Sequence, residues 1–301
     1  MSTPLDIRAG RRTVPVSRPG KALFPSRGIT KADPVEYYQS VARRMLPHLR
    51  NRPLMLERHP DGIEGKSFMQ KEVPDHFPDW IHRVELPKEG GTVTYVLCDD
   101  TATLIYLVDQ GCLTLHRFLS RADRPDHPDR LVFDLDPPGD DFAAVRAAAL
   151  QLHQLLDELR LPSAVMTTGS RGLHVVVPLD RRAPFDEVRA LAHDLADLLA
   201  SRYPDTLTTA PRKQARRGRL YLDVQRNTYA QTVVAPYAVR ARPEASAAAP
   251  LTWDEVEDPG IDARSFTIDS IAGRLDLNPW GNVLRHRCSV RAAQRRLEDV
   301  G

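Results

Sequence analysis

The 301-residue sequence contains few cysteines and lacks any long apolar run. Its three cysteines, Cys98, Cys112 and Cys288, are far apart and form no C-x-x-C pair. This spacing disfavours both a disulfide framework and a thiolate zinc site. No stretch approaches the ~18 apolar residues of a membrane-spanning helix, and no apolar run follows the N-terminal charges as in a secretory signal. We therefore expect a cytoplasmic protein without a membrane partner.

The chain also lacks an excess of charge of one sign, since its formal net charge is only +2. The charges are nevertheless separated along the sequence. Such separation is typical of a protein that holds a polyanion beside an acidic metal site. The alternative is that each basic run is an ordinary solvated face. Acidic residues gather in FDLDPPGDD, and basic residues gather at Arg8, Arg11, Arg12, Arg18 and Lys21, at Arg43, Arg44, Arg50 and Arg52, and at Arg212, Lys213, Arg216, Arg217 and Arg219.

The N-terminal third contains one clear helix signal. The pattern predicts a helix from Asp33 to about His48, with Asp33 as its cap and Pro34 at the first helical position. Two later runs, TVTYVLC (92–98) and TLIYLVDQ (103–110), have the composition of strands. The stretch ARPEASAAAP (241–250) has the composition of a surface connection.

The middle third alternates strand and helix patterns in the order βαββαβ. This is the split βαβ order of ferredoxin-like folds, in which both helices cover one face of a four-stranded antiparallel sheet. The first strand of that topology lies between the third and the fourth. The expected strands are 130–136, 164–168, 173–179 and 219–225, and the expected helices are 141–159 and 185–202.

Side-chain alternation brings acidic residues of these strands to one face of the sheet. Asp134 and Asp136 share a face of the first strand, because strand side chains alternate with period two. By the same alternation Asp223 on the fourth strand and His174 on the third lie opposite the apolar residues of their strands. We therefore expect three carboxylates and one histidine to converge on the face without helices.

Such a cluster favours a bound cation. Carboxylates at strand-neighbour distances repel one another unless a cation neutralises them. Oxygen ligands suit Mg²⁺ or Mn²⁺, and a pair of such ions ~3.5–4 Å apart clamps the attacking and leaving oxygens of a phosphoryl transfer. The alternative is that D-x-D is only a strand end with solvated charges.

Several motifs in this order resemble one family. They are KALFPSRGITKADPVEYYQSVARRMLPHLRNRPL, GKSFMQK, LVFDLDP, TTGSRGLHVVVPL and YLDVQRN. Together they are similar to the polymerase domain of the bacterial ligase D end-joining proteins, within the archaeo-eukaryotic primase superfamily. The resemblance implies an α+β, primase-like fold in which the split βαβ (ferredoxin-like or RRM-like) catalytic core spans 131–242. An additional N-terminal α/β subdomain (1–130) would bind the DNA end and template, and a C-terminal segment (243–301) would pack on the same domain.

The resemblance also implies an activity. It is that of a DNA-dependent nucleotidyltransferase, a polymerase that fills or extends DNA ends in non-homologous end joining. It implies Mn²⁺ or Mg²⁺ at a two-ion site, NTP or dNTP substrates with a preference for ribonucleotides, and a nucleoid-associated place in a bacterial cell. The implied partners are gapped or 3′-overhanging DNA ends bearing a 5′-phosphate, Ku, and a separate ATP-dependent DNA ligase.

The resemblance also implies which residues bind metal and nucleotide, since positions of this sequence match the family's motifs. Asp134, Asp136 and Asp223 match the catalytic, metal-binding carboxylates. Thr168, which stands where the family commonly has serine, and His174 match contacts to the incoming triphosphate, and the glycines around them suit a phosphate-cradling turn. The remaining expected nucleotide-binding residues are His116, near the sugar, Arg240, on the phosphates, Ser170 and Gln225.

The expected DNA contacts lie in the N-terminal part. Lys21 and Lys31 match lysines that grip the 5′-phosphate, and Arg18 adds charge where relatives tend to have asparagine. Phe68 matches an aromatic that stacks on the template. The alternatives are ordinary surface lysines and a core phenylalanine.

Two other classes of function stay open at this point. One is a metal-dependent nuclease or phosphohydrolase that uses the same carboxylates. The other is a non-catalytic scaffold bridging Ku and ligase, which would not need the carboxylates together with His174 and Arg240. The sequence has no P-loop and no G-x-S-x-G elbow, so a P-loop ATPase and a serine hydrolase are disfavoured.

Overall fold

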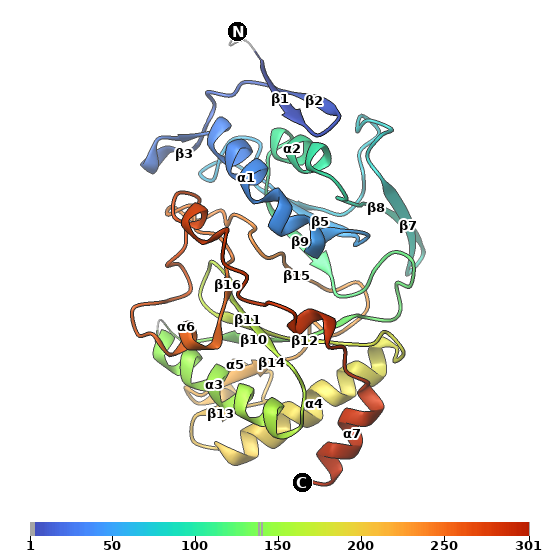
Figure 1. The fold of residues 1–301 in the computed structure, drawn as a ribbon, viewed down its shortest axis with the longest axis vertical. Coiled ribbons are helices and arrows are strands. Elements are labelled where there is room, and N and C mark those ends of the chain that lie inside the picture. The colour runs from blue at the N-terminus through green and yellow to red at the C-terminus, as the bar shows by residue number, and fades with distance from the viewer. Residues whose placement is uncertain (1–3, 138, 140, 301) are drawn as a thin grey trace. The chain divides into compact units, whose positions relative to one another are not determined.

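The computed structural model of the chain describes residues 4–137, 139 and 141–300 (Figure 1). The chain forms two compact units, each assembled from discontinuous segments, which differs from the three consecutive segments expected from the sequence. Unit 1 comprises Met1–Asp123, Thr232–Ala248 and Phe266–Leu277, and unit 2 comprises Arg124–Gln231, Ala249–Ser265 and Asn278–Gly301.

Unit 1 is built around a four-stranded sheet with the order β15-β9-β5-β6. The pairs β1–β2, β3–β4 and β7–β8 form separate two-stranded sheets. Its elements are β1 (Leu5–Ala9), β2 (Arg12–Val16), β3 (Ala22–Phe24), η1 (Pro25–Arg27), β4 (Ile29–Thr30), α1 (Ala32–Leu49), β5 (Leu54–Arg58), β6 (Phe68–Gln70), β7 (Arg83–Lys88), β8 (Gly91–Val96), α2 (Thr101–Asp109), β9 (Cys112–Phe118), β15 (Thr232–Val234) and η2 (Ile271–Arg274).

The helix predicted after residue 32 is confirmed, but its cap is not the predicted one. Lys31 occupies the cap position of α1, and Asp33 lies in the first turn. The Asp33 carboxylate reaches back to accept hydrogen bonds from the backbone and hydroxyl of Thr30, so it caps no helical N–H group. The buried face of α1 repeats at helical spacing, as an amphipathic helix requires, through Val35, Tyr38, Ala42, Met45 and Leu49.

One of the two strands predicted next is wrong. The run 92–98 does form β8, whereas TLIYLVDQ lies largely in helix α2. Asp100 starts this helix, because its side chain accepts a hydrogen bond from Thr103 N at 2.7 Å. A short apolar run fits a buried helix as well as a strand, and here the cap decides between them.

Unit 2 contains a six-stranded sheet with the order β13-β14-β10-β12-β11-β16. The four predicted core strands pair antiparallel with β10 between β12 and β14, which confirms the split βαβ topology. The elements of unit 2 are β10 (Arg130–Asp136), α3 (Phe142–Glu158), β11 (Ala164–Thr167), β12 (Leu173–Pro178), α4 (Phe185–Arg202), β13 (Leu207–Thr208), α5 (Lys213–Arg216), β14 (Leu220–Asp223), β16 (Pro250–Leu251), α6 (Trp253–Glu257), η3 (Val283–Arg285) and α7 (Val290–Glu298).

Both long helices of unit 2 cover the same side of this sheet (Figure 1). Helices α3 and α4 contact β10 and each other, and α7 packs against α4. Leu131, Phe133 and Leu135 are fully buried, while Asp134 and Asp136 between and beyond them remain partly exposed. The apolar side of β10 therefore faces the helices, and its carboxylates project from the other face.

The stretch 241–250 corrects another expectation. Ala245 to Pro250 are buried, so this part is no surface connection. In unit 1 the Ser246 carbonyl accepts a hydrogen bond from Arg240 N, and in unit 2 β16 pairs with β11. Alanine-rich composition resembles that of a linker, but small side chains also allow backbone to pack closely against backbone.

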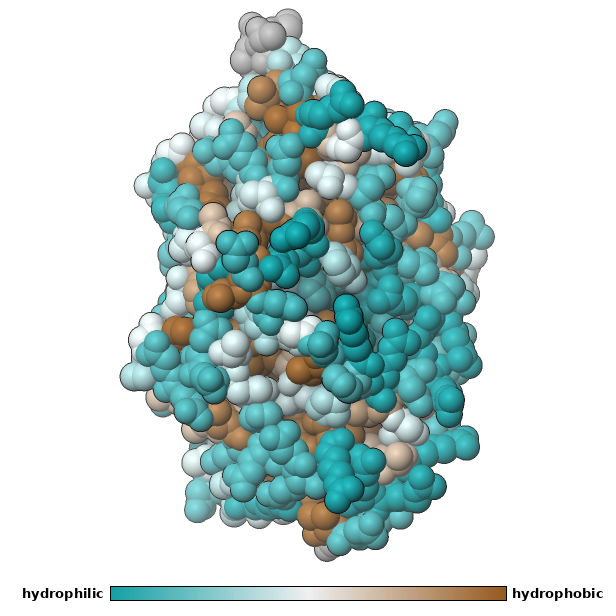
Figure 2. All heavy atoms as spheres, viewed as in Figure 1, coloured by the Kyte–Doolittle hydropathy of each residue, from teal (hydrophilic) through white to brown (hydrophobic). Residues whose placement is uncertain are grey.

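The outer surface is mainly hydrophilic on the face drawn in Figure 2, where apolar residues form small scattered groups. Among the described residues, no helix combines the length and apolar character needed to cross a bilayer.

Candidate active site

Strand pairing places three carboxylates of unit 2 on two adjacent strands. Asp134 on β10 lies directly opposite Asp223 on β14, and Asp136 lies opposite Tyr221. On the other side of β10, Asp134 pairs with His174 on β12. Directly opposed residues have Cβ atoms about 4.5–5.5 Å apart. This register therefore places residues that alternation assigned to one face next to one another.

His174 lies against the first of these carboxylates. Its Nε2 is 3.4 Å from Asp134 Oδ1, and its side chain is only 5% exposed. The other carboxylate oxygen, Asp134 Oδ2, lies 3.8 Å from Nε of Arg226. Asp134 thus sits between an imidazole and a guanidinium, and Arg226 is a residue that the sequence reasoning missed although it lies within YLDVQRN.

Asp136 is held in a different environment. Burial and the neighbouring Asp134 carboxylate raise the pKa of Asp136, while Arg171 opposes this shift. The Nη2 atom of Arg171 is 3.1 Å from Asp136 Oδ2. A carboxyl with a raised pKa is incompletely neutralised by its surroundings, so a further cation nearby would stabilise its ionised form.

The turn between β11 and β12 lies against the end of β10. A Cβ atom at Gly172 would stand 2.0 Å from the Leu135 carbonyl oxygen and 2.7 Å from Asp136 Oδ1, so only glycine fits there. Gly169 has a φ of +63°, which glycine adopts without strain. These two glycines therefore bring the turn to the carboxylates.

The same turn is closed by hydrogen bonds to the hydroxyl of Thr168. The hydroxyl of Thr168 accepts hydrogen bonds from the N–H groups of Ser170 (3.3 Å) and Gly172 (3.2 Å). It also donates to the Gly172 carbonyl at 3.1 Å, and Thr168 is buried. Thr168 thus closes the turn from inside, and the Ser170 and Gly172 N–H groups are directed at its hydroxyl.

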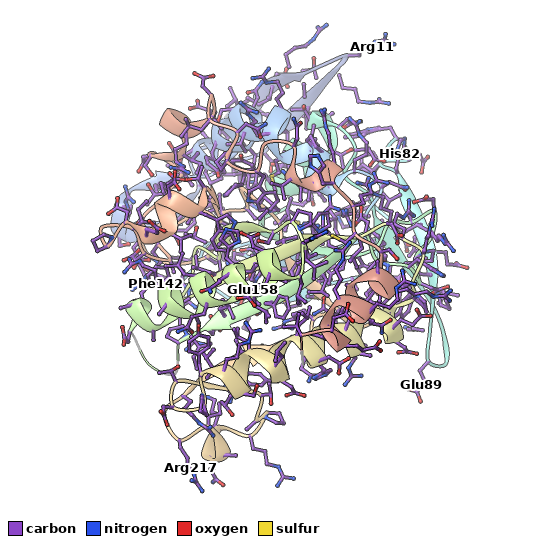
Figure 3. All side chains as sticks on the ribbon, turned by 60° about the horizontal axis from the view of Figure 1, so that its bottom comes forward. Arg11, His82, Glu89, Phe142, Glu158 and Arg217 are labelled. Carbon is purple, nitrogen blue, oxygen red and sulfur yellow. The ribbon has the colours of Figure 1, made fainter. Side chains whose placement is uncertain are left out.

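A pocket of about 290 Å³ opens over the carboxylates. Basic residues of the segment between β13 and β14 contribute to its wall, and Figure 3 shows Arg217 at the outer end of that segment. Arg216 lies 4.1 Å from the centroid of the Tyr221 ring, a cation–π contact that holds its guanidinium beside the pocket. The basic run found in the sequence therefore borders the acidic site. The lining residues are Asp134, Asp136, Pro137, Arg171, Lys213, Arg216, Gly218, Tyr221 and Asp223.

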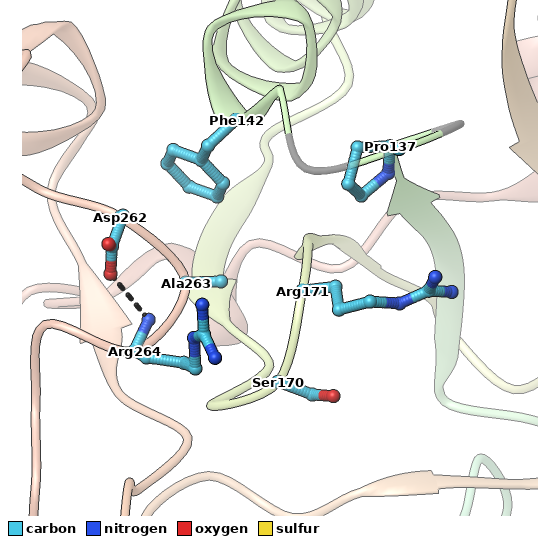
Figure 4. Close-up of a pocket in the computed structure, with 8 residues that line it drawn as sticks. Pro137, Phe142, Ser170, Arg171, Asp262, Ala263 and Arg264 are labelled. Carbon is cyan, nitrogen blue, oxygen red and sulfur yellow. Dashed lines mark hydrogen bonds between the residues drawn. The ribbon is translucent and has the colours of Figure 1, made fainter. Parts of the chain in front are cut away.

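A smaller pocket lies on the other side of the turn (Figure 4). Ser170 and Arg171 line it together with Phe142 and Arg264. In Figure 4 the Arg171 side chain extends from the turn toward β10, and Arg264 lies across the pocket, where its backbone N–H donates to Asp262 Oδ1 at 2.7 Å. Ser170 thus borders this second pocket.

The carboxylates have the chemistry of a divalent-cation site but do not form a preassembled one. Among residues 4–137, 139 and 141–300, no three His, Cys, Asp or Glu side chains converge as ion ligands. Asp134 and Asp136 are directed at arginines, and Asp223 Oδ1 accepts a hydrogen bond from Gln225 N at 2.8 Å. Oxygen donors on adjacent strands are the ligand type that Mg²⁺ or Mn²⁺ prefers. Gln225 itself follows the end of β14 and is exposed.

Two of the expected nucleotide-binding residues, His116 and Arg240, belong to unit 1, and both influence the Glu57 carboxylate. His116 Nε2 on β9 is 3.5 Å from Glu57 Oε2 on β5, and His59 Nε2 is 3.2 Å from Glu57 Oε1. Hydrogen bonds from His116 and His59, with charge from His116 and Arg240, hold the pKa of Glu57 well below its usual range. Glu57 was missed by sequence reasoning, which had no signal that LERHP would face a neighbouring strand.

The two expected DNA-binding lysines differ sharply in the structure. Lys21 Nζ is 2.6 Å from Asp61 Oδ1, and the Asp61 side chain is 73% exposed. Lys31 is buried, with its Nζ 3.0 Å from Asp109 Oδ1 and 3.1 Å from Ser17 Oγ. Lys31 is therefore no surface lysine, and its amino group is engaged with protein atoms.

Arg18 and Phe68 lie at the surface of unit 1. Arg18 has a φ of +47° in the turn between β2 and β3, next to Ser17. Phe68 is 47% exposed on β6, an outer strand of the sheet, and the Arg58 guanidinium lies 5.3 Å from its ring centroid. This exposure excludes a core role for Phe68.

Comparison with known proteins agrees with this fold. Residues 30–280 match the family described as LigD, primase-polymerase domain. The chain is 34% identical over 276 residues to the multifunctional non-homologous end joining protein LigD of Mycolicibacterium smegmatis, covering 90% of this chain and 35% of that protein. It is 31% identical over 294 residues to LigD of Pseudomonas aeruginosa, covering 96% and 35%. The chain thus spans about a third of the length of these relatives.

A solved structure matches nearly end to end. The polymerase domain of Mycobacterium tuberculosis ligase D, in complex with DNA, superposes with a TM-score of 0.85 at 31% identity, covering 92% of this chain and 99% of that chain. The fold and the carboxylate-bearing sheet define a protein of the primase-polymerase class. Within that class, the chain belongs to the LigD primase-polymerase domain family.

Proposed function

We propose that this chain is a DNA-dependent nucleotidyltransferase that fills or extends DNA ends in non-homologous end joining. The observation that carries the proposal is the register of Asp134 against Asp223 and His174, within a fold shared with a DNA-bound polymerase domain. The proposed substrates are NTPs and dNTPs, with ribonucleotides preferred. The proposed partners are gapped or 3′-overhanging DNA ends, Ku, and a separate ATP-dependent ligase.

Asp134, Asp136 and Asp223 would hold two Mn²⁺ or Mg²⁺ ions, because they supply only oxygen donors on adjacent strands. When bound, the ions supply charge neutralisation for the phosphates and for the oxygens that attack and leave. Burial and the Asp134 carboxylate raise the pKa of Asp136 although Arg171 lies 3.1 Å away, so a bound cation would stabilise its ionised form.

The remaining pocket residues would bind and orient the triphosphate. Lys213 and Arg216 place positive charge on the rim above the carboxylates, which favours entry of an anionic substrate. His174 keeps the Asp134 carboxylate in place from the buried side. In unit 1, Glu57 holds His116 in one orientation, which suits the proposed hydrogen bond between that imidazole and the nucleotide sugar.

DNA-end recognition is proposed for the surface of unit 1. Lys21 and Arg18 would contact the 5′-phosphate. The buried amino group of Lys31 would act indirectly, by donating a hydrogen bond to Ser17 Oγ and so holding the residue next to Arg18. Phe68 would stack on a template base.

Primer extension tests the proposal. Labelled gapped DNA with a 5′-phosphate is incubated with Mn²⁺ and with ribo- or deoxynucleotides in parallel, and lengthening is expected, faster with ribonucleotides. Asp134→Asn should slow extension by at least about 100-fold, the scale of loss when a group that stabilises transition-state charge is removed. Asp157→Asn is the matched control, since the Asp157 side chain is 63% exposed on α3.

Shortening of the primer would indicate a nuclease activity and contradict the proposed polymerase activity. No change in length, or extension that persists in excess chelator, would contradict the proposed chemistry. Near-normal extension by Asp134→Asn would contradict the assignment of the carboxylates.

A further inference from the structure

Asn227 lies in the turn after β14, within YLDVQRN, and it is 0% exposed. Its Oδ1 accepts a hydrogen bond from Val132 N at 2.9 Å. Its Nδ2 donates to the Val132 carbonyl at 2.7 Å and to the Val224 carbonyl at 2.9 Å. The Asn227 side chain therefore links the backbone of β10, at Val132, to the backbone at Val224, just after β14.

The contact stands where the β10–β14 ladder stops. The last pair of the ladder is Asp134–Asp223, and in the same register Val132 would next face Gln225. Gln225 N instead donates to Asp223 Oδ1, and the chain leaves the sheet. The carboxamide of Asn227 supplies the donor and the acceptor that a continued strand would have offered to Val132, because it carries the same polar groups as a peptide.

This replacement matters because β14 is poorly supported at its end. The strand has four residues, and β13 pairs only with Leu220 and Tyr221. At Asp223 the only hydrogen-bonded neighbour among the described strands is β10. Strand ends with few hydrogen bonds open most readily, and opening here would separate Asp223 from Asp134. The same turn also carries Arg226, which lies beside the Asp134 carboxylate.

We propose that Asn227 is a positioning residue that fastens the end of β14 to β10, so that Asp223 stays opposite Asp134 at the spacing a shared divalent cation requires. The inference rests on the proposed function, since it assigns Asn227 to the support of the metal-binding carboxylates. Residues that orient metal ligands from behind change metal affinity about 10–100-fold when they are removed.

Direct Mn²⁺ binding tests the inference without an activity measurement. Free Mn²⁺ is measured by electron paramagnetic resonance for wild type, Asn227→Ala and a control, Trp280→Phe. The control also removes a buried side-chain hydrogen bond to backbone in unit 2, from Trp280 Nε1 to the Val165 carbonyl at 2.7 Å, on the far side of the sheet from β14. Asn227→Ala should weaken Mn²⁺ binding by about 10-fold or more, whereas Trp280→Phe should change it less than about twofold, below that range.

Amide hydrogen exchange supplies a second readout. The Val132 amide should exchange faster in Asn227→Ala, because it loses its acceptor, while Trp280→Phe leaves that amide protected. If Asn227→Ala does not fold at the assay temperature, Asn227→Ser, a smaller disruption that keeps a hydroxyl, is measured by the same criterion.

The outcomes separate this inference from the proposed function. If wild type binds Mn²⁺ and extends primers but the folded Asn227 variant binds Mn²⁺ within twofold of wild type, the positioning role is wrong and the function stands. If wild type neither binds Mn²⁺ nor extends primers, both are overturned. If Mn²⁺ binding weakened equally in Asn227→Ala and Trp280→Phe, general destabilisation of unit 2 would explain the effect and the positioning role would also be refuted.

Discussion

Replacing Lys31 with methionine should destabilise unit 1 strongly, although the sequence marks this residue as a DNA contact. The Lys31 and Asp109 side chains are only 4% and 8% exposed, and their charged atoms are 3.0 Å apart. Lys31→Met keeps most of the volume and removes the charge, which leaves the Asp109 carboxylate buried without its cation.

The size of the loss follows from what remains around Asp109. Removing one partner of a buried ion pair costs about 3–5 kcal/mol. Asp109 Oδ1 still accepts hydrogen bonds from Ser17 N at 2.7 Å and Ser17 Oγ at 3.0 Å, which offset part of this cost. We therefore expect a loss of about 3 kcal/mol in the free energy of unfolding, at the lower end of that range.

Guanidinium denaturation followed by circular dichroism measures this loss, with Lys21→Met as the matched control. Lys21 pairs with the exposed Asp61, so its replacement should change stability much less. In DNA binding the order should reverse, with Lys21→Met reducing the preference for a 5′-phosphate while stability is kept. Stability losses of equal size in the two variants would refute the reasoning. Recovery of stability in Lys31→Met combined with Asp109→Leu would support it.

Two further predictions concern the turn at the active site and the Glu57 cluster. Gly172→Ala should lower the free energy of unfolding by about 1–3 kcal/mol and reduce primer extension, because its Cβ would overlap the Leu135 carbonyl. The control is Gly273→Ala, whose Cβ would meet no atom within 4 Å. Equal stability of the two variants would count against the close approach at Gly172. The pKa of Glu57 is lowered in the folded state, so ionisation of this carboxyl stabilises the fold. The stabilisation is fully present above the unfolded pKa of about 4.3 and is lost as pH falls toward the folded-state pKa. Glu57→Gln should therefore lower the melting temperature at pH 7. The difference from wild type should begin to shrink below about pH 4.3 and disappear only as pH approaches the strongly lowered folded pKa. Thermal melts across pH check this, with the exposed Glu89→Gln as control, and a pH-independent difference would contradict it.

The core of unit 2 was predictable because its signals are local and periodic. Alternation on β10 placed Asp134 and Asp136 on one face, and the βαββαβ order placed β10 between β12 and β14. The edge strands β13 and β16 have two residues each, too few to show any period. The helix α2 was mistaken for a strand because its apolar residues fit both periods, and only the Asp100 cap separates them.

The sequence by itself determined the family, the order of the four core strands of unit 2 and the identity of its three carboxylates, because alternation and motif order depend on neighbours along the chain. Only the tertiary structure decided that Lys31 is buried against Asp109, that Glu57 serves His116, and that Asn227 completes the ladder for Val132. Each of these depends on a partner at least 59 residues away in the chain. Contacts at such separations are set by how the strands and helices pack, and no periodic pattern in the sequence records them.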